Sequence, residues 1–181
     1  MIHADVIGKT VAAYLQRHPE EATQLASLTT ALTQHGNLTS RKTFIGHVTC
    51  SAIVIDPAGR VLYIRHNALN SWLRPGGHLE PDDTSLTGAA LREVTEETGI
   101  PADQLRLVED IPVDIEVHPI PAVQAKGEPD HQHFDLRYAF TTRSMPDVKL
   151  QAEEVHDFRW LPADEIESPT IRHRVAALRP A

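Results

Sequence analysis

Residues 75–100, PGGHLEPDDTSLTGAALREVTEETGI, decide the fold that we expect for this chain. The stretch opens with a Gly-rich turn, whose glycines permit φ > 0 and a close approach of backbone to a ligand. A charged loop and a predicted helix follow, and Gly99 is placed as the left-handed stop of that helix. This order of parts suits a divalent cation together with a phosphate chain.

The predicted helix is amphipathic, and its apolar stripe becomes acidic near the C-terminal end. The stripe comprises Leu86, Ala89, Ala90, Leu91 and Val94. At 3.6 residues per turn the stripe continues to Glu97, with Glu93 beside it and Glu96 at its edge. Carboxylates on adjacent turns repel one another, and oxygen ligands without cysteine suit Mg²⁺ or Mn²⁺. We therefore expect a metal site, against the alternative of a solvated acidic helix face.

These residues carry a family resemblance. The stretch resembles the Nudix box of the MutT-like Nudix hydrolases, Gly-x5-Glu-x7-Arg-Glu-apolar-x-Glu-Glu-x-Gly-apolar. Residues 92–100 match its right half and Gly77 fits its left end. The spacing from Gly77 to the box arginine is one residue longer than usual, so the place of the first box glutamate falls on Asp83 or Thr84. Asp83 can serve there as an acceptor, whereas Thr84 or Ser85 can cap the helix.

The resemblance implies a fold and an activity. The expected fold is α/β, a Nudix-like α/β/α sandwich with a mixed sheet over residues 43–181, preceded by an N-terminal helical extension over residues 1–42. The implied activity is metal-dependent hydrolysis of a pyrophosphate linkage in a nucleoside diphosphate joined to another moiety. The implied cofactor is Mg²⁺ or Mn²⁺, and the implied partner is a small nucleotide-type substrate.

The box acids have expected roles. Glu93 and Glu97 are the first-choice ligands because they lie one turn apart, and Glu96 is either a further ligand or the proton acceptor. Arg92 points away from the stripe and is expected to orient a carboxylate. Through the resemblance, the carbonyl of Gly76 and an acid shortly before Trp160 join the ligands. The expected metal set is Glu93, Glu96, Glu97, Gly76 and Glu154, and the expected catalytic set is Glu93, Glu96 and Arg92.

A second polar row is expected on the strand over residues 131–140. Phe134, Leu136, Tyr138 and Phe140 share one face, and His131, His133, Asp135 and Arg137 share the other. We favour cleft lining for this row over a solvent-facing row. A zinc or manganese site ranks third, because no fourth ligand is apparent. The expected substrate-binding residues are Arg65 and Arg74, for phosphate, and His133 and Asp135.

Other elements follow from periodicity and turn signals. Two helices are predicted in the first 40 residues, the first ending near Arg17 and the second running from Pro19 to a stop at Gly36-Asn37. A hairpin is predicted over residues 47–55 and 60–66, and a strand over 155–161. Residues 105–117 alternate as one long strand that can break at Pro112 and has one wet face. A short amphipathic helix is expected over residues 168–178.

Composition narrows the class of protein. A chain of 181 residues that is 41% hydrophobic can build a real core. The net charge of −8 argues against a nucleic-acid polymer as partner. The start of the chain does not resemble a signal peptide and no stretch of ~20 apolar residues occurs, so a cytoplasmic protein without membrane contact is expected. A homodimer through the N-terminal helices is a further possibility.

Two other classes share the expected scaffold. A non-catalytic nucleotide-binding module would usually lose box acids, whereas all three are present here. An isopentenyl diphosphate isomerase-like enzyme needs a cysteine in the cleft. Cys50, the single cysteine, lies in an apolar run and is expected to be a small core residue.

Overall fold

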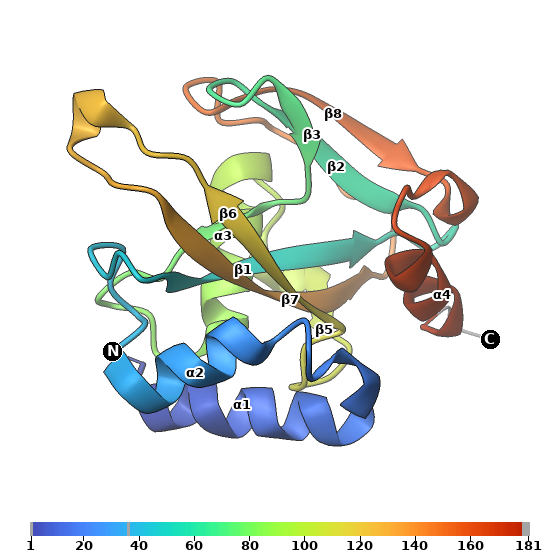
Figure 1. Ribbon diagram of the computed structural model, residues 1–181. Coiled ribbons are helices and arrows are strands. Elements are labelled where there is room, and N and C mark those ends of the chain that lie inside the picture. Colours follow the sequence, from blue (N-terminus) through green and yellow to red (C-terminus); the bar gives the residue numbers. More distant parts are fainter. Residues whose placement is uncertain (1, 36, 179–181) are drawn as a thin grey trace.

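The computed structural model describes residues 2–35 and 37–178, and shows a mixed sheet with helices on both faces (Figure 1). The strands are β1 (His47–Ile55), β2 (Val61–His66), β3 (Ser71–Leu73), β4 (Gly76–His78), β5 (Leu105–Leu107), β6 (Asp114–Ile120), β7 (His131–Thr142) and β8 (Val155–Leu161). The α-helices are α1 (Ala4–Arg17), α2 (Ala26–His35), α3 (Leu86–Thr98) and α4 (Pro169–Ala177). Short 3₁₀ turns are η1 (Pro19–Glu21), η2 (Ala102–Gln104), η3 (Gln124–Lys126) and η4 (Ala163–Glu165). The expected fold class is confirmed.

Strands β1 and β7 form the centre of the sheet. They run parallel, in register from His47 opposite His133 to Ile55 opposite Thr141. The other pairs are antiparallel: β6 and β5 pair with β7, and β3 and β8 pair with β2. The second edge of β1 is divided, because it meets β2 only at Ile55 and pairs with β4 near its middle. Every residue of β1 is buried.

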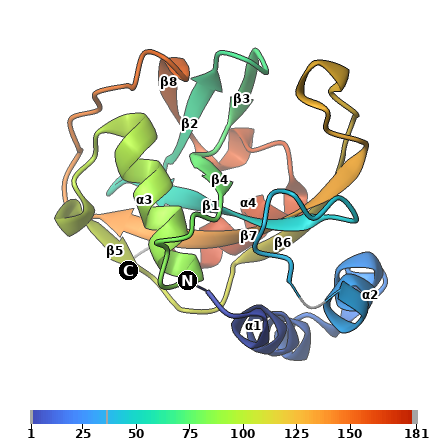
Figure 2. The same cartoon turned by 90° about the vertical axis from the view of Figure 1, so that its left-hand side faces the viewer.

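The central strands separate two hydrophobic clusters. Alternation along β1 sends Val48, Cys50, Ala52 and Val54 into a cluster with α1, α2 and α3, and sends Ile53 and Ile55 into a cluster with η4 and α4. In Figure 2, α3 lies in front of β1 and β7 and α4 lies behind them. The second face is apolar only near α4, so its other half, beside β4, is free to carry polar side chains.

The N-terminal helices differ from the prediction at one boundary. The first helix ends at Arg17 as expected, but the second begins at Ala26 rather than Pro19. Residues Pro19–Glu21 form a single 3₁₀ turn, in which Glu21 accepts hydrogen bonds from Tyr14 and Arg174. These side-chain contacts fix the turn, and one of the partners, Arg174, is 153 residues away in the sequence. The predicted stop at Gly36 lies outside the described residues, and α2 ends at His35.

The strand predicted over residues 105–117 is interrupted, and the interruption over residues 108–113 includes Pro112, where the sequence allowed a break. It forms two strands, β5 and β6, which pair with successive parts of the same edge of β7. The wet face is wrong at Asp114, which is 8% exposed because Arg137 and Arg174 donate to its two oxygens. Strand β6 continues through Pro119 to Ile120, which is possible because Pro is tolerated on an edge strand.

The Gly-rich stretch is a strand and not a turn. Gly76 and Gly77 are absent from the glycines with positive φ, and residues 76–78 pair antiparallel with Ser51, Cys50 and Thr49. The turn expected at these glycines is therefore wrong. The glycines are required by close approach, since a Cβ on Gly76 would lie 2.3 Å from the Cβ of Ser51. Within the described residues, no helix has the length and apolarity that crossing a membrane requires.

Candidate active site

Helix α3 presents the box acids because both of its ends are fixed. The hydroxyl of Ser85 accepts from the backbone N–H of Gly88 at 3.0 Å, so Ser85 is the N-cap. Gly99 ends the helix with φ of 67°. The predicted stripe is confirmed, with Leu86, Ala89, Ala90 and Val94 buried and Leu91 partly buried. Glu97 continues the stripe and is only 3% exposed.

Glu97 reaches from the end of α3 to β4. Its Oε2 accepts the backbone N–H of Gly76 at 3.0 Å. The pKa of Glu97 is raised to about 8, chiefly by burial and then by the charges of Glu93 and Glu154, and the hydrogen bond from Gly76 only partly opposes this shift. A buried carboxylate with neighbouring like charges is under electrostatic stress that a cation would relieve.

Glu93 lies against the second glycine of β4. A Cβ on Gly77 would stand 2.5 Å from Oε1 of Glu93, so only glycine leaves room for this carboxylate. Burial raises the pKa of Glu93 to about 7, although the charge and hydrogen bond of Arg92 oppose the shift. The paired glycines thus hold two carboxylates at one short strand.

Arg92 connects the loop before α3 to the acids on it. Its guanidinium donates to both oxygens of Asp83 at 3.1 and 3.2 Å and to the carbonyl of His78 at 2.9 Å. It also donates to Glu93 at 3.0 Å and to Glu96 at 2.8 Å. Burial alone would lower the pKa of Arg92, but these hydrogen bonds and charges raise it overall. Asp83, and not Thr84, therefore provides the acceptor in the lengthened box.

The three box carboxylates do not converge on one point. Among the described residues, the groups of three His, Cys, Asp or Glu ligand atoms within 4.8 Å of one another are His47/His78/His133 and His18/Glu20/Glu21. The side chain of Glu96 is 50% exposed and is held by Arg92. Glu93 and Glu97 with the adjacent backbone are consequently the donors that lie at β4. Mg²⁺ commonly takes one or two carboxylates and fills its remaining positions with water and phosphate oxygens, so this donor set fits it.

Glu154 approaches the box acids from the segment before β8. That segment is tied to the helix end, because the N–H of Gln151 donates to the carbonyl of Glu97 at 3.2 Å. The carbonyl of Glu154 accepts from the N–H of Asn67 at 2.7 Å. The carboxylate of Glu154 is exposed, and its charge contributes to the raised pKa values of Glu93 and Glu97. The exposed Glu154 side chain thus lies close enough to act on both acids.

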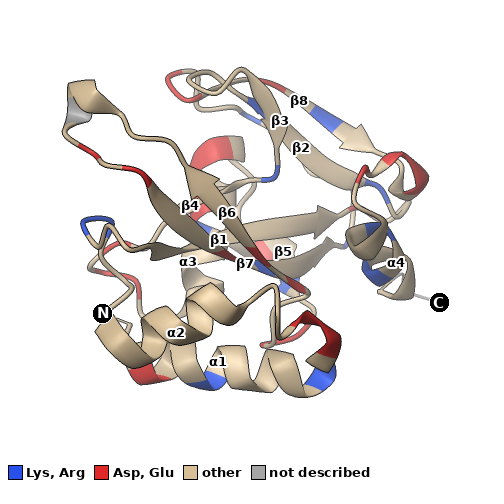
Figure 3. Cartoon of the chain, in the orientation of Figure 1, with Lys and Arg blue, Asp and Glu red and all other residues tan. Residues whose placement is uncertain are grey.

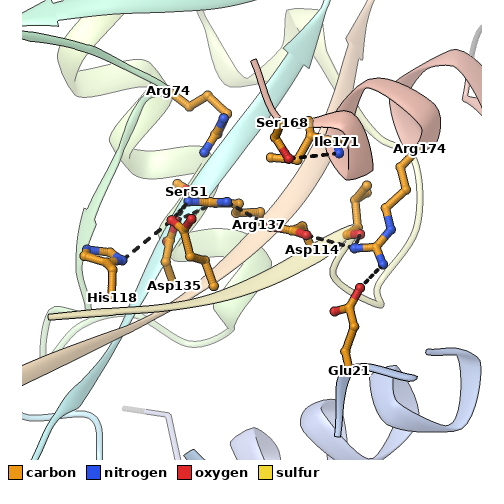
Figure 4. A network of polar contacts seen from close by, with 12 residues as sticks. Glu21, Ser51, Arg74, Asp114, His118, Asp135, Arg137, Ser168, Ile171 and Arg174 are labelled. Carbon is orange, nitrogen blue, oxygen red and sulfur yellow. Dashed lines mark hydrogen bonds and ion pairs between the residues drawn. The ribbon is translucent and has the colours of Figure 1, made fainter. Parts of the chain in front are cut away.

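Two arginines were expected to bind phosphate, Arg65 on β2 and Arg74 in the link between β3 and β4. Figure 3 shows acidic positions in the C-terminal half of α3 and basic ones around β2, β3 and β8. Arg74 donates to the hydroxyl of Tyr63 at 3.4 Å, while its buried Nε has no partner among the described residues. Its guanidinium points toward Asp135 (Figure 4). Arg65 lies farther along β2, with its guanidinium carbon 5.6 Å from the centre of the Trp72 ring.

The polar row on β7 is confirmed in its facing but is not exposed. Asp135 is 8% exposed and accepts from Ser51 at 2.7 Å, Thr49 at 3.2 Å and Arg137 at 2.9 Å. Burial by itself would raise the pKa of Asp135, but the charge of Arg137 and these hydrogen bonds hold it below its usual range. A solvent-facing row is therefore wrong: His131, Asp135 and Arg137 are buried, and side chains of β1 and β6 bond to Asp135 and Arg137 on this face.

The polar row continues into a series of ion pairs that the sequence did not predict. Arg137 donates to Asp114 at 2.8 Å, Arg174 donates to the other oxygen of Asp114 at 2.8 Å, and Arg174 also pairs with Glu21 (Figure 4). The chain joins the turn after α1, helix α4 and strands β6 and β7. No local signal marks these partners, since Glu21 and Arg174 are 153 residues apart.

Two histidines were also missed. His47 on β1 and His78 on β4 meet His133 of β7, and we call these three residues the histidine cluster. Burial first, and then the charges of neighbouring histidines, lower the pKa of His78 to about 4 and of His133 to about 3, and burial lowers that of His47. The rings of His78 and His133 are therefore neutral at pH 7. The sequence does place His47 on the same face of its predicted strand as the polar residues Thr49 and Ser51.

Cys50 is in the core. It is 0% exposed, and burial raises the pKa of its thiol well above the usual value. Its side chain lies on the α3 side of β1, within the first hydrophobic cluster. The isomerase-like alternative therefore loses the cleft cysteine that it requires.

Residues 46–179 match the family model described as the NUDIX domain. This chain belongs to the Nudix family. A probable DHNTP pyrophosphohydrolase of Lactococcus lactis subsp. cremoris is 34% identical over 91 residues, which cover 50% of this chain and 51% of that protein. Phosphatase NudJ of Escherichia coli K12 is 46% identical over 61 residues, 33% of this chain and 39% of that protein. The chain thus spans about half, or less, of the length of these curated relatives.

The solved structures agree on the fold. The structure of the E. coli dihydroneopterin triphosphate pyrophosphohydrolase matches with a TM-score of 0.56 at 19% identity, and covers 72% of this chain and 92% of that one. A Nudix-family hydrolase from Clostridium perfringens matches with a TM-score of 0.52 at 18% identity, over 74% of this chain and 93% of that one. At these identities the likeness concerns the architecture.

Proposed function

We propose that this Nudix-family chain hydrolyses a phosphoanhydride bond in a small nucleotide-type diphosphate or triphosphate, with Mg²⁺ or Mn²⁺. The observation that carries the proposal is the pair of carboxylates held against Gly76 and Gly77 of β4, the partly buried Glu93 and the buried Glu97. Arg92 pairs with Glu93, whereas Glu97 has no cationic partner among the described residues. A buried charge without a counter-charge is costly, which favours a function that brings a cation to Glu97. When bound, the ion would neutralise phosphate charge and lower the pKa of a water ligand.

The ligands in this proposal are Glu93, Glu97 and the carbonyl of Gly76, with Glu96 and Glu154 at the rim. Glu93 and Glu97 provide hard oxygen donors, as Mg²⁺ and Mn²⁺ prefer. Glu96 is half exposed and can accept the proton of an attacking water. Arg92 acts as a positioning residue, because it donates to Glu93 and Glu96 from an anchor on Asp83.

The substrate side of the proposal uses the basic residues opposite α3. Arg74 offers a buried Nε without a partner among the described residues, so a phosphate oxygen can satisfy it. Arg65 lies beside Trp72 and can contact the far group of the substrate. Asp135 is fully engaged with its neighbours and acts by keeping Arg137 and the β1 hydroxyls in place. His133 lines the same half of the sheet.

The domain division is part of the proposal. We propose residues 43–181 as the catalytic domain and residues 1–42 as an appended helical piece. Helices α1 and α2 share the hydrophobic cluster of α3 and β1, so this piece is expected to support the domain by packing. A homodimer through these helices is tested by size-exclusion chromatography with light scattering on the full chain.

A substrate panel tests the activity. ADP-ribose, dinucleoside polyphosphates and CDP-alcohols are incubated with the protein and Mg²⁺, and alkaline phosphatase converts any released phosphomonoester to inorganic phosphate. Dihydroneopterin triphosphate and oxidised nucleoside triphosphates, coupled to inorganic pyrophosphatase, extend the panel toward the activity named for a relative. At least one substrate should turn over, and EDTA should stop the reaction.

The matched variant is Glu97→Gln, with exposed Glu165→Gln as its control. Loss of a ligand should lower the rate by at least about 100-fold, because the metal contributes several kcal/mol of charge stabilisation. Absence of turnover across the panel, or full turnover by Glu97→Gln, would refute the proposed function.

A further inference from the structure

The histidine cluster brings together side chains from three strands. The pairing of β1 with β7 sets His47 directly opposite His133, and the pairing of β1 with β4 sets His78 opposite Thr49. The ring centres are 4.7 Å apart for His47 and His133, and 5.0 Å apart for His47 and His78 and for His78 and His133. The cluster therefore exists only in the folded sheet.

The nitrogens of these rings are close to ligand geometry. One ring nitrogen from each histidine lies within 4.8 Å of the other two. A tetrahedral ion with Zn–N bonds of about 2.0–2.1 Å would hold its nitrogens about 3.4 Å apart. The difference is small enough for side-chain rotation to close it. His78 and His133 are only partly buried.

His47 supplies an independent sign of a ligand. It is 2% exposed, and its Nε2 is buried without a hydrogen-bond partner among the described residues. Its Nδ1 lies 3.4 Å from the carbonyl oxygen of Thr43. A metal-binding histidine usually donates one ring N–H to such a carbonyl and leaves the other nitrogen for the ion. A buried ring nitrogen without a hydrogen-bond partner is otherwise destabilising.

We propose that His47, His78 and His133 bind a divalent transition-metal ion, with Zn²⁺ as the best fit. Neutral imidazole suits Zn²⁺, Ni²⁺ and Cu²⁺, whereas Mg²⁺ prefers oxygen. Three histidines and one open position form the arrangement in which Zn²⁺ keeps a water or an anionic ligand. His131 stacks on His47, with centres 5.0 Å apart, and keeps that ring in place.

This site is separate from the carboxylate site but lies beside it. Gly76, Gly77 and His78 are consecutive residues of one strand, so the Cα atoms of Gly76 and His78 are about 7 Å apart. The backbone of Gly76 serves Glu97, and the side chain of His78 serves the histidine cluster. An ion in the cluster would bring positive charge next to the place where the proposed substrate phosphates lie.

The test uses Co²⁺ as the probe, because tetrahedral Co²⁺ absorbs strongly in the visible range. The full chain is stripped with EDTA, dialysed and titrated with Co²⁺ in the Glu97→Gln background, which weakens the carboxylate site. We expect one equivalent of tetrahedral Co²⁺ per chain. Zn²⁺ should displace it at one equivalent, and a large excess of Mg²⁺ should not.

The variants separate the cluster from the rest of the molecule. His78→Gln and His133→Gln should each weaken Co²⁺ binding by at least about 100-fold, the upper end of what loss of an outer-shell partner costs. His173→Gln, at an exposed position on α4, should bind normally. Circular dichroism and melting in EDTA show that each variant is folded. His47 is buried, so its variant is not required for the conclusion.

The outcomes are decisive and independent of the hydrolase proposal. A wild-type chain without tetrahedral Co²⁺ absorption, or folded His78→Gln and His133→Gln variants with unchanged binding, would overturn the site. Tetrahedral Co²⁺ bound in Glu97→Gln and lost in folded His78→Gln and His133→Gln variants would establish the site whatever the reaction. Failure of the substrate panel would leave the Co²⁺ result unaffected.

Discussion

Replacing Glu97 by Gln should stabilise the metal-free protein while removing its response to Mg²⁺. Burial raises the pKa of Glu97 from an ordinary value of 4.5 to about 8. An acid with a raised pKa in the folded state binds more protons there than in the unfolded chain between these two values. Stability contributed by the protonated form is therefore present below pH 4.5 and is lost as the pH rises toward 8. Gln does not ionise, so the Glu97→Gln variant does not lose this stability as the pH rises.

The magnitude follows from the same shift. Relative to low pH, this pKa difference lowers the free energy of unfolding by about 1 kcal/mol at pH 5 and by about 4 kcal/mol at pH 8. Gln keeps an oxygen that can accept the N–H of Gly76, so the packing of the site is preserved. At about 2–4 °C per kcal/mol for a chain of this size, Glu97→Gln should melt several degrees above wild type at pH 8 and close to it at pH 5.

The assay is thermal unfolding in EDTA and in millimolar Mg²⁺, at pH 5 and pH 8. Wild type should gain stability from Mg²⁺ at pH 8 because the ion binds the folded state, and Glu97→Gln should not. Glu165→Gln, an exposed exchange of the same kind, should follow wild type throughout. Equal pH slopes for wild type and Glu97→Gln in EDTA would refute the electrostatic reasoning, and a retained Mg²⁺ shift would refute the ligand assignment.

Three further outcomes are expected. Gly76→Ala should lower the free energy of unfolding by more than Gly77→Ala in urea titrations, because the new Cβ meets backbone and a Cβ in the first case and only a flexible carboxylate in the second; equal losses would contradict this. Asp83→Ala should cost about 1.5–3 kcal/mol, because Arg92 loses its hydrogen bonds to buried Asp83 but keeps its ion pairs with Glu93 and Glu96, and a loss below about 0.5 kcal/mol would show that this anchor is dispensable. Cys50→Ala should keep full turnover, and the native thiol should resist modification until the protein unfolds; loss of turnover in a folded Cys50→Ala variant would reopen the isomerase alternative.

Helix α3 could be predicted from the sequence because the residues that determine it lie within one short segment. Helical spacing decides which residues share the stripe with Glu97, Ser85 caps the first turn, and Gly99 ends the last one. The same locality explains the strand predictions over residues 47–55, 60–66 and 155–161, which correspond to β1, β2 and β8. The lengthened box left two candidates for its first acid, and only the guanidinium of Arg92 selected Asp83.

The pairing of the strands could not be predicted from local sequence. The predicted hairpin of β1 and β2 touches at one pair, Ile55 with Val61, while the principal neighbour of β1 is β7. Which strand pairs with β1 depends on which strands pack their faces against α3 and α4. That packing energy is summed over residues from the whole chain. The role of Gly76 was misjudged for the same reason, since its crowding comes from Ser51 on another strand.

The sequence by itself determined the amphipathic helix, its acidic end, the alternation of β7 and the buried character of Cys50, because each depends on periodicity or composition within a short segment. The tertiary structure alone decided that β7 runs beside β1, that Asp114 is buried between Arg137 and Arg174, and that three histidines from separate strands meet. Contacts between residues 31 to 86 positions apart, as in the histidine cluster, have no local signature. They form only when strands from distant parts of the chain assemble on a common hydrophobic core, and the free energy of that assembly comes from the whole fold.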